Sequence, residues 1–314
     1  MIVRRTLLKG LLALGFSGAS LGAYAFGIEP RFLLSVTRYR LTPARWPLGL
    51  RLRLAVVADV HVGAPYMPLK RVSEIVARTN ILGADAILVL GDYQASYRWV
   101  THRIPAHEWA PVLAGLKAPL GVHAVLGNHD WWDDPEAQQR GRGPTLAGRA
   151  LERAGVPVYE NDAVRLTKAG HSFWLAGLGD QLAFRTGRVD KWERFRGVDD
   201  LQSTLAKIDD SSPVILMAHE PDIFPDVPSR VAVTVCGHTH GGQVRIAGYS
   251  PIVPSKFGNR YAYGHVVENN RDLIVSGGLG CSKLPIRFGM PPEIVVIDLE
   301  ASEGDADRTG INPV

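Results

Sequence analysis

Five short, mostly apolar runs, each followed closely by a polar side chain, limit what this 314-residue chain can fold into. Each run has five residues and is rich in aliphatic side chains, which is typical of a buried strand. The clearest example is the run 231–235, which precedes the sequence GHTHGGQ at residues 237–243. The other runs are followed by Asp59-Val60-His61, Gly91-Asp92, Gly127-Asn128-His129-Asp130 and His219.

The polar residues after these runs are predicted to meet in space. In an open α/β sheet, functional groups gather at the carboxyl ends of the strands. Imidazole nitrogens and carboxylate oxygens are common metal ligands, and neighbouring glycines let the backbone approach a small charged group. One His-X-His pair is weak evidence, because histidines are ordinary loop residues. Five strand ends of the same kind indicate a metal or phosphate site.

The rest of the chain predicts two sheets with flanking helices. Strand, helix and strand alternate over residues 50–126, which is the pattern of parallel βαβ units. Helices are expected over 69–82, 106–116, 146–154 and 199–208. A second sheet is expected to begin with short strands at 156–159, 163–167 and 172–178. Later strands are expected at 214–218, 231–235, 244–246, 273–275 and 294–299.

The ordered motifs DxH, GD, GNHD, H and GHTH resemble those of the calcineurin-like metallophosphoesterase superfamily over about residues 52–299. GHTHGGQ and the later segments 277–280, 284–289 and 292–294 resemble its YkuE/YaeI-type branch. The resemblance implies an α/β fold, the metallo-dependent phosphatase fold, which is a four-layer αββα sandwich of two mixed β-sheets flanked by helices. The implied domain spans 51–300, after a lead-in strand and linker at 26–50 and before a frayed tail at 301–314.

The resemblance also implies a binuclear centre that binds two divalent cations. Two cations about 3.5–4 Å apart can lower the pKa of a shared water and clamp a phosphoryl group. Asp92 is the expected bridging ligand. The other expected ligands are Asp59, His61 and His240 for one cation, and Asn128, His219 and His238 for the second. This nitrogen and oxygen set suits Mn, Fe or Zn without choosing among them, and the sequence does not say whether Cys236 and Cys281 pair.

His129 follows the ligand Asn128 and is the expected catalytic residue. An imidazole in this place could donate a proton to the leaving oxygen or stabilise charge on the phosphoryl group. Many family members read GDxxDR, in which the later Asp orients this histidine and the Arg holds the phosphate. Here Ala95 and Ser96 occupy those positions, and neither can do that work. Asp130 or another acid is a candidate replacement.

Three further residues are candidates for substrate binding. Trp131 and Trp132 directly follow GNHD, and in an extended segment they could not both face one core. One of them is therefore expected to line the substrate cleft, with core packing as the alternative for each. Asp180, at the end of the sequence Gly-Leu-Gly-Asp, is the third candidate.

Residues 1–25 have the pattern of a targeting segment. Arg4-Arg5 and Lys9 precede an uncharged, glycine-rich stretch at 10–27. The pattern resembles a twin-arginine signal with a cleavage site at 23–25, which makes the twin-arginine export machinery an expected partner. The alternative is an uncleaved membrane anchor, because 18 uncharged residues approach the length of a membrane span. Either alternative predicts an exported or inner-membrane-associated protein, with the periplasmic or cell-envelope side favoured.

The charge balance narrows the substrates expected of such a phosphoesterase. Residues 1–53 carry a net charge of +8, and because the whole chain carries +4, the remainder carries −4. A slightly acidic body argues against a nuclease that binds through a broad basic face. We expect hydrolysis of a phosphodiester or pyrophosphate bond, in a lipid-linked substrate such as UDP-2,3-diacylglucosamine, at a membrane surface. The alternatives are a broadly specific phosphomonoesterase and a weakly active metal-binding relative.

Overall fold

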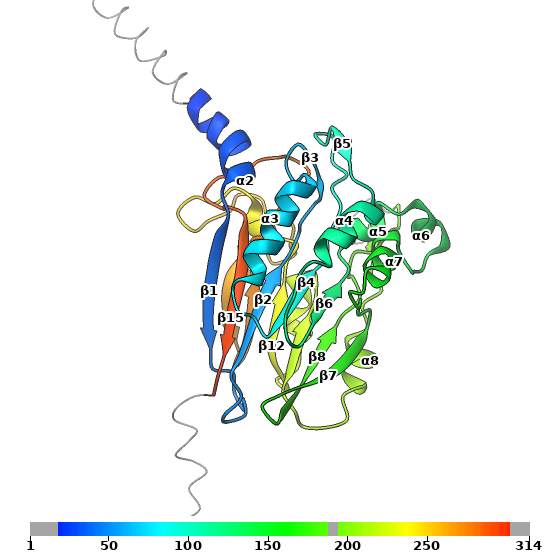
Figure 1. Cartoon of the computed structure of the whole chain (residues 1–314), viewed down its shortest axis with the longest axis vertical. Coiled ribbons are helices and arrows are strands. Elements are labelled where there is room, and N and C mark those ends of the chain that lie inside the picture. Colours follow the sequence, from blue (N-terminus) through cyan, green and yellow to red (C-terminus); the bar gives the residue numbers. More distant parts are fainter. Residues whose placement is uncertain (1–17, 188–193, 302–314) are drawn as a thin grey trace, which may run out of the picture.

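The computed structural model describes residues 18–187 and 194–301 as two β-sheets packed face to face between helices (Figure 1). The first sheet has five strands in the order β1-β15-β2-β4-β6, and the second has six in the order β13-β14-β12-β11-β8-β7. The first sheet consists of β1 (Ser35–Leu41), β2 (Leu52–Val57), β4 (Ala86–Leu90), β6 (Val122–Val125) and β15 (Glu293–Leu299). The second consists of β7 (Asp162–Lys168), β8 (His171–Gly177), β11 (Val214–Met217), β12 (Val231–Cys236), β13 (Gly264–Glu268) and β14 (Arg271–Val275).

Both sheets are mixed, as predicted. β2, β4 and β6 are parallel to one another, whereas β15 is antiparallel to β2 and parallel to β1. In the second sheet the central strands β8, β11, β12 and β14 are parallel, and β7 and β13 add antiparallel edges. The parallel βαβ units expected over residues 50–126 are therefore confirmed.

Three apolar clusters separate the layers. Because side chains alternate along a strand, Leu54 and Val56 of β2 face the second sheet, where they share a core with Ile215 and Val233. The opposite face of the first sheet packs under the helices α3 (Leu69–Asn80), α4 (Ala106–Leu113) and α7 (Leu146–Arg153). The outer face of the second sheet packs against α8 (Leu201–Ala206) and the 3-10 helix η2 (Pro221–Asp226). These layers form the predicted αββα sandwich.

The site-bearing segments leave the sheets at one end of the molecule, which is the upper end in Figure 1. The carboxyl ends of β2, β4 and β6 lie there, and the segments after β11 and β12 meet them. The N-terminal helical segment joins the body at the same end. It consists of residues 18–23, the π-helical turn η1 (Tyr24–Ile28) and α2 (Glu29–Phe32). None of the helices in the described part of the chain has the length and apolar character needed to span a bilayer.

The structure differs from the prediction in several short elements. Residues 156–159 and 244–246, which were predicted as strands, form only isolated bridges to neighbouring segments. Two helices were not predicted, α5 (Asn128–Trp132) and α6 (Pro135–Arg140), because five or six residues are too few for apolar periodicity to reveal. The remaining short elements are β3 (Gly63–Ala64), β5 (His102–Arg103), β9 (Phe184–Arg185), β10 (Phe195–Arg196), η3 (His240–Gly242) and η4 (Gly258–Tyr261).

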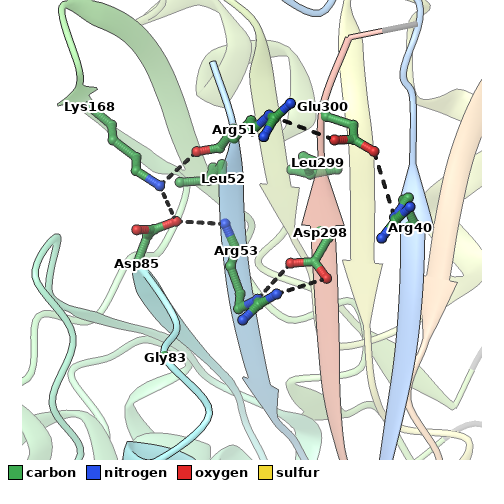
Figure 2. A pocket seen from close by; sticks show the side chains of 10 residues that line it. All are labelled: Arg40, Arg51, Leu52, Arg53, Gly83, Asp85, Lys168, Asp298, Leu299 and Glu300. Atoms are coloured by element: carbon green, nitrogen blue, oxygen red, sulfur yellow. Dashed lines mark hydrogen bonds and ion pairs between the residues drawn. The ribbon is translucent and has the colours of Figure 1, made fainter. Parts of the chain in front are cut away.

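A charged hollow lies at the opposite end of the sheets, where β2 begins and β15 ends (Figure 2). Its cations are paired with the acids beside them: Lys168 with Asp85 at 2.5 Å, and Arg53 with Asp298 at 2.6 Å. None of the predicted site residues lines it. The chemistry predicted from the motifs therefore belongs to the other end of the molecule.

Candidate metal centre

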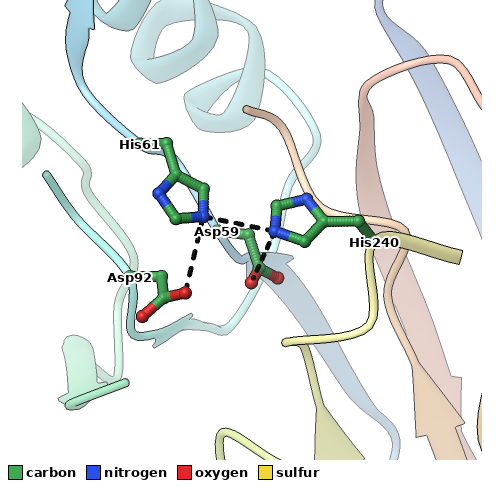
Figure 3. A group of neighbouring side chains, drawn as sticks. All are labelled: Asp59, His61, Asp92 and His240. Atoms are coloured by element: carbon green, nitrogen blue, oxygen red, sulfur yellow. Dashed lines mark hydrogen bonds and ion pairs between the residues drawn. The ribbon is translucent and has the colours of Figure 1, made fainter. Parts of the chain in front are cut away.

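Asp59, His61, Asp92 and His240 form one group of possible metal ligands at the carboxyl ends of β2, β4 and β12 (Figure 3). One ligand atom from each lies within 4.8 Å of the others, and all four residues are buried. Nε2 of His61 lies 3.4 Å from Oδ2 of Asp92 and 3.2 Å from Nε2 of His240. Two imidazole nitrogens and two carboxylates thus face one small volume, as the ligands of a shared cation would.

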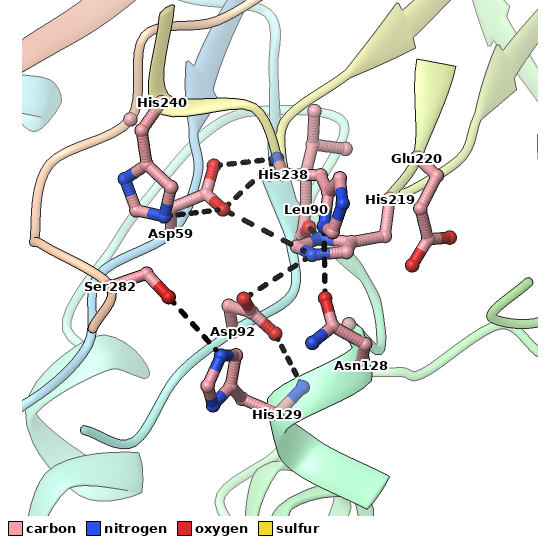
Figure 4. Close-up of polar contacts among 12 residues, drawn as sticks. Asp59, Leu90, Asp92, Asn128, His129, His219, Glu220, His238, His240 and Ser282 are labelled. Carbon is pink, nitrogen blue, oxygen red and sulfur yellow. Dashed lines mark hydrogen bonds and ion pairs between the residues drawn. The ribbon is translucent and has the colours of Figure 1, made fainter. Parts of the chain in front are cut away.

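A second group lies on the other side of Asp92 and contains His219, Glu220 and His238 (Figure 4). Nε2 of His219 lies 3.4 Å from the same Oδ2 atom of Asp92 that faces the first group. The amide oxygen of Asn128 lies 2.9 Å from Nδ1 of His238. All seven predicted ligands therefore lie together, and Asp92 stands between the two groups, which fits the bridging role predicted for it.

The backbone at these residues is held in an uncommon conformation. Asp59, His61, Asp92, His238 and His240 all have positive φ angles, between 47° and 69°. Such a conformation costs on the order of 1–3 kcal/mol per residue and is concentrated at functional sites. Two glycines of the motifs, Gly127 and Gly237, are required because a side chain there would collide with the carboxylates of Asp92 and Asp59. A Cβ at position 127, for example, would lie 2.5 Å from Oδ1 of Asp92.

Burial sets the protonation of the site. It lowers the pKa of His61 to about 4 and that of His238 to about 3, so both imidazoles are neutral near pH 7 and have a lone pair for a metal. Burial raises the pKa of Asp59 to about 7, although the nearby His219 opposes it. Burial also acts against the charged form of Asp92, but the surrounding histidines, His219 foremost, outweigh it and hold the pKa of Asp92 well below its usual range.

The residues fit a pair of divalent cations. Nε2 of His219 is buried without a hydrogen-bond partner among the described residues, while its Nδ1 is held by the carbonyl oxygen of Leu90 at 2.6 Å. Burial favours the neutral ring of His219, but the carboxylate of Asp92 outweighs it and raises the pKa of His219 well above its usual range, so a metal would take Nε2 in exchange for its proton. A second ring nitrogen fixed by a carbonyl oxygen is the usual arrangement of a metal-ligating histidine. Cys236 and Cys281 are free thiols outside both groups, so the facing atoms are nitrogen and oxygen. The choice among Mn, Fe and Zn stays a prediction.

His129 stands beside the centre without belonging to either group. Its ring centroid lies 5.1 Å from that of His61, and its Nε2 lies 3.3 Å from the hydroxyl of Ser282. Its Nδ1 faces Oδ2 of Asp133 at 3.8 Å, and neither of these two buried atoms has a hydrogen-bond partner in the described part of the chain. Burial alone would lower the pKa of His129, but the carboxylates of Asp92 and Asp133 outweigh it and raise the pKa. An imidazolium in this place can donate a proton.

Asp133 stands where an acid is needed to replace the one missing at position 95. The sequence offered Asp130, but its carboxylate accepts hydrogen bonds from the backbone N–H groups of Asp92, Tyr93 and Gly127. Because α5 is helical, the residue four positions after His129 lies on the same side of the helix. From the sequence, residues 127–133 were expected to form a loop. The four-residue spacing between His129 and Asp133 therefore did not indicate that the two side chains would meet.

We expect Asp133→Asn to lower kcat by roughly 10- to 100-fold, the usual effect of losing a partner that orients a functional side chain. The amide leaves the volume unchanged but removes the charge that favours the protonated imidazole of His129. The measurement is kcat on a soluble bis-aryl phosphodiester, with metal content determined in parallel and expected to be unchanged. Asp134→Asn is the control, because Asp134 caps α6 and should affect stability alone. Equal kcat in the wild type and Asp133→Asn would contradict the assignment.

Trp131 and Trp132 point in different directions, because successive residues of a helix are rotated by roughly 100°. Trp131 has 0% exposure and packs against Phe184, with ring centroids 5.2 Å apart. The structure therefore corrects its candidacy for substrate binding and places it in the core. Trp132 is half-buried, lies 5.2 Å from the ring of His129 and stacks on Phe195 at 4.8 Å. It is the one of the pair that lies beside the centre.

Asp180 lies buried beside Glu220 of the second ligand group. Its side chain is buried, and burial together with the neighbouring carboxyl group of Glu220 raises the pKa of Asp180 well above its usual range. Glu220 follows His219 directly and belongs to the second ligand group. The structure therefore moves Asp180 from the substrate candidates to the residues that support the side of the site around His219.

Arg287 is a buried charged residue beside the centre that reasoning about ligands missed. Its guanidinium is fully buried and donates hydrogen bonds to the carbonyl oxygens of Gly277, Gly280 and Met290. Its Nη2 lies 3.4 Å from Nδ1 of His240. Arg287 lies in the segment 284–289, which resembles the YkuE/YaeI-type branch, so the sequence did mark this segment. The residues around Arg287 gave no indication that its side chain lies beside the metal centre.

Comparison with known proteins places this geometry in a family. The family model of calcineurin-like phosphoesterases matches residues 52–242. Three relatives are similar over most of both chains. They are the uncharacterized metallophosphoesterase YkuE of Bacillus subtilis (28% identity, 95% of this chain and 98% of the relative), phosphodiesterase YaeI of Escherichia coli (26%, 95% and 100%) and UDP-2,3-diacylglucosamine pyrophosphatase LpxG of Chlamydia trachomatis (26%, 87% and 91%).

The chain belongs to the calcineurin-like phosphoesterases, because that model covers more than half of it. It is a metal-dependent phosphoester hydrolase, and the predicted fold class and superfamily are confirmed. The two ligand groups of the structure suit the binuclear divalent metal site of such an enzyme. When bound, the metals supply the nucleophilic water and neutralise charge on the phosphoryl oxygens.

Proposed function

We propose that this enzyme hydrolyses a phosphodiester or an esterified pyrophosphate and prefers these substrates to monoesters. The observation that carries the proposal is that position 96, where many family members have a phosphate-holding arginine, is a serine in this chain. The buried guanidinium nearest the ligands, that of Arg287, is already bound by backbone carbonyl oxygens. A phosphomonoester presents a dianionic group, whereas a diester or esterified pyrophosphate carries less charge at the reacting phosphorus. The absence of an arginine at position 96 should therefore reduce turnover of a diester less than turnover of a monoester.

Side chains next to the centre favour a substrate with a second substituent. The half-buried indole of Trp132 lies beside His129 and stacks on Phe195, and the guanidinium of Arg185 lies 4.8 Å from the centre of that indole ring. An aromatic surface with a cation above it can hold a base, an aryl group or a second phosphate. The lipid-linked substrate, of the kind named for the relative LpxG, is part of this proposal.

The residues divide the work of hydrolysis. Asp59, His61, Asp92, Asn128, His219, His238 and His240 hold the cations. His129 donates the proton on Nε2 to the leaving oxygen, with Asp133 holding the other side of the ring and the hydroxyl of Ser282 beside Nε2. Trp132 excludes water from one side of this proton transfer and orients the leaving substituent.

We expect a higher kcat/KM for an aryl phosphodiester than for the matched aryl monoester under the same metal. We also expect Trp132→Ala to raise KM by about tenfold for substrates with a lipid or large apolar substituent, because an aromatic contact of this kind contributes about 1–3 kcal/mol. Steady-state kinetics on both substrate classes measures each effect.

Trp174→Ala is the matched control for that experiment. Trp174 lies on the second sheet, where its indole donates to Asp210, and its replacement should leave KM unchanged. A monoester turned over as well as the diester would favour the alternative of a broadly specific phosphomonoesterase. If the metal-loaded protein gave no rate above free metal ion, the weakly active metal-binding relative would be the better description.

We further propose export by the twin-arginine machinery, with action on the cell-envelope side. Arg4 and Arg5 lie outside the described residues, so the support is the sequence pattern of basic residues before an uncharged stretch. Replacing both by lysine should block export, as measured by cell fractionation. Unchanged export in that variant would contradict the proposal, and N-terminal sequencing of the mature protein would decide between cleavage and a retained anchor.

A further inference from the structure

Exposed apolar side chains gather on three segments around the metal centre. One is the N-terminal helical segment, in which Phe26, Ile28 and Phe32 are 40%, 47% and 68% exposed. The second is the loop 244–254, in which Ile246, Tyr249 and Ile252 are 58%, 61% and 78% exposed. The third is the segment 282–288, in which Leu284 is 48% exposed. We call these seven side chains the apolar rim.

The three segments are neighbours in the fold, and each is joined to the next by direct contacts. The backbone N–H of Arg287 donates to the carbonyl oxygen of Ala25, and the ring of Phe288 meets that of Tyr24 edge to face at 6.2 Å. The N–H of Arg245 donates to the carbonyl oxygen of Phe288, which ties the loop 244–254 to the third segment. In Figure 1 the N-terminal helix and the loop around residue 250 both project at the end that carries the metal centre.

The rim is attached directly to the site. The carbonyl oxygen of Pro254 accepts a hydrogen bond from Nε2 of His238 at 2.9 Å, and the hydroxyl of Ser282 lies 3.3 Å from Nε2 of His129. The apolar side chains therefore lie on the segments that border the metal ligands. Monomeric soluble proteins rarely gather so many exposed apolar side chains at one place unless that place binds a partner.

Charge on these segments identifies the partner. Residues 18–33, 243–257 and 281–290 contain a single acidic residue, Glu29, and its carboxylate is buried against the N–H groups of Gly289 and Met290. Their basic residues are Arg31, Arg245, Lys256, Lys283 and Arg287, of which Lys256 and Lys283 are exposed and Arg287 is buried. Apolar side chains with basic residues and no exposed acid are the pattern of a surface that enters an anionic lipid interface.

The sequence before the rim supports the same partner. Residues 10–28 contain no charged side chain, and the described part of this stretch, residues 18–28, belongs to the exposed helical segment at this end of the molecule. We propose that the apolar rim docks onto the surface of an anionic phospholipid bilayer, with the opening of the metal centre facing the lipid headgroups. The proposal concerns the surface of the protein and does not depend on the identity of the substrate.

The test uses the full-length, metal-loaded chain with vesicles of phosphatidylglycerol and, separately, of phosphatidylcholine. Hydrogen–deuterium exchange maps which backbone segments the vesicles protect, and this readout locates contact even when the N-terminal segment tethers the chain. We expect protection of 244–254 and 284–288 by phosphatidylglycerol. The double variant Tyr249→Ser, Ile252→Ser should weaken vesicle binding by about tenfold or more and abolish that protection.

Ile81→Ser is the matched control, because Ile81 is 71% exposed at the end of α3, away from the metal centre. It should bind vesicles as the wild type does, and both variants should hydrolyse a soluble aryl diester normally. Absence of protection in the loop 244–254, or equal binding by wild type and double variant, would overturn the proposal.

Equal binding to vesicles of both lipids would overturn the role of charge. Protection of the same segments without vesicles, caused by self-association, would identify a second copy of the chain as the partner. A chain that hydrolyses nothing but shows the protection leaves docking established and refutes the proposed function alone.

Discussion

Asp92→Ala is expected to lose one of two bound metal ions. It should also reduce turnover by much more than the roughly 10- to 100-fold loss that follows replacement of a residue that only orients a metal ligand. The carboxylate lies 3.4 Å from Nε2 of both His61 and His219, so its removal takes a ligand from each group at once. It also removes the negative charge between two cations, which then repel each other. Metal analysis per chain and kcat/KM on a soluble diester measure the two effects.

The control for this prediction separates ligation from folding. Oδ1 of Asp92 also accepts the backbone N–H of His129 at 2.8 Å, so the alanine variant alone could disturb α5. Asp92→Asn keeps the size of the side chain and that acceptor oxygen, and should retain the circular dichroism spectrum while losing metal and turnover. Two tightly held ions per chain in either variant would refute the bridging assignment.

Arg287→Met is expected to destabilise the protein by about 3 kcal/mol or more and to weaken metal binding at the His240 side by roughly 10- to 100-fold. The guanidinium donates to three buried carbonyl oxygens, and each loses its donor in the variant. Two of those carbonyls, at Gly277 and Gly280, belong to a turn packed against Asp59, since the N–H of Gly280 donates to the Asp59 carbonyl oxygen at 2.7 Å. Lysine should not rescue the variant, because it lacks the planar fork that reaches several acceptors.

Arg271→Met is the matched control. Arg271 is also buried, and its guanidinium also donates only to backbone carbonyl oxygens, those of Phe224, Pro225, Val227 and Glu268, away from the metal centre in the second sheet. We expect a comparable fall in the free energy of unfolding with unchanged metal affinity. Thermal unfolding and metal titration of both variants give the comparison. Equal metal affinity in Arg287→Met and the wild type would restrict Arg287 to a role in stability.

The sequence by itself determined the two sheets and which polar side chains gather at their ends as candidate metal ligands. Both depend on local patterns: apolar runs of strand length, and polar residues with glycines at their ends. Parallel strands bring those ends to one edge, so Asp59 and Asp92 meet whatever the details of packing. Local sequence patterns were therefore enough to identify the candidate ligand residues.

Only the tertiary structure decided which residues support them. Asp133 reaches His129 because the segment is helical, and the same helix turns Trp131 into the core and Trp132 toward the site. Arg287 acts on His240 across 47 residues of sequence. Asp180 lies beside Glu220 because its strand-end segment packs against that of Glu220. Contacts of this kind depend on backbone conformation and on the meeting of distant segments, and neither leaves a periodic signal in the sequence.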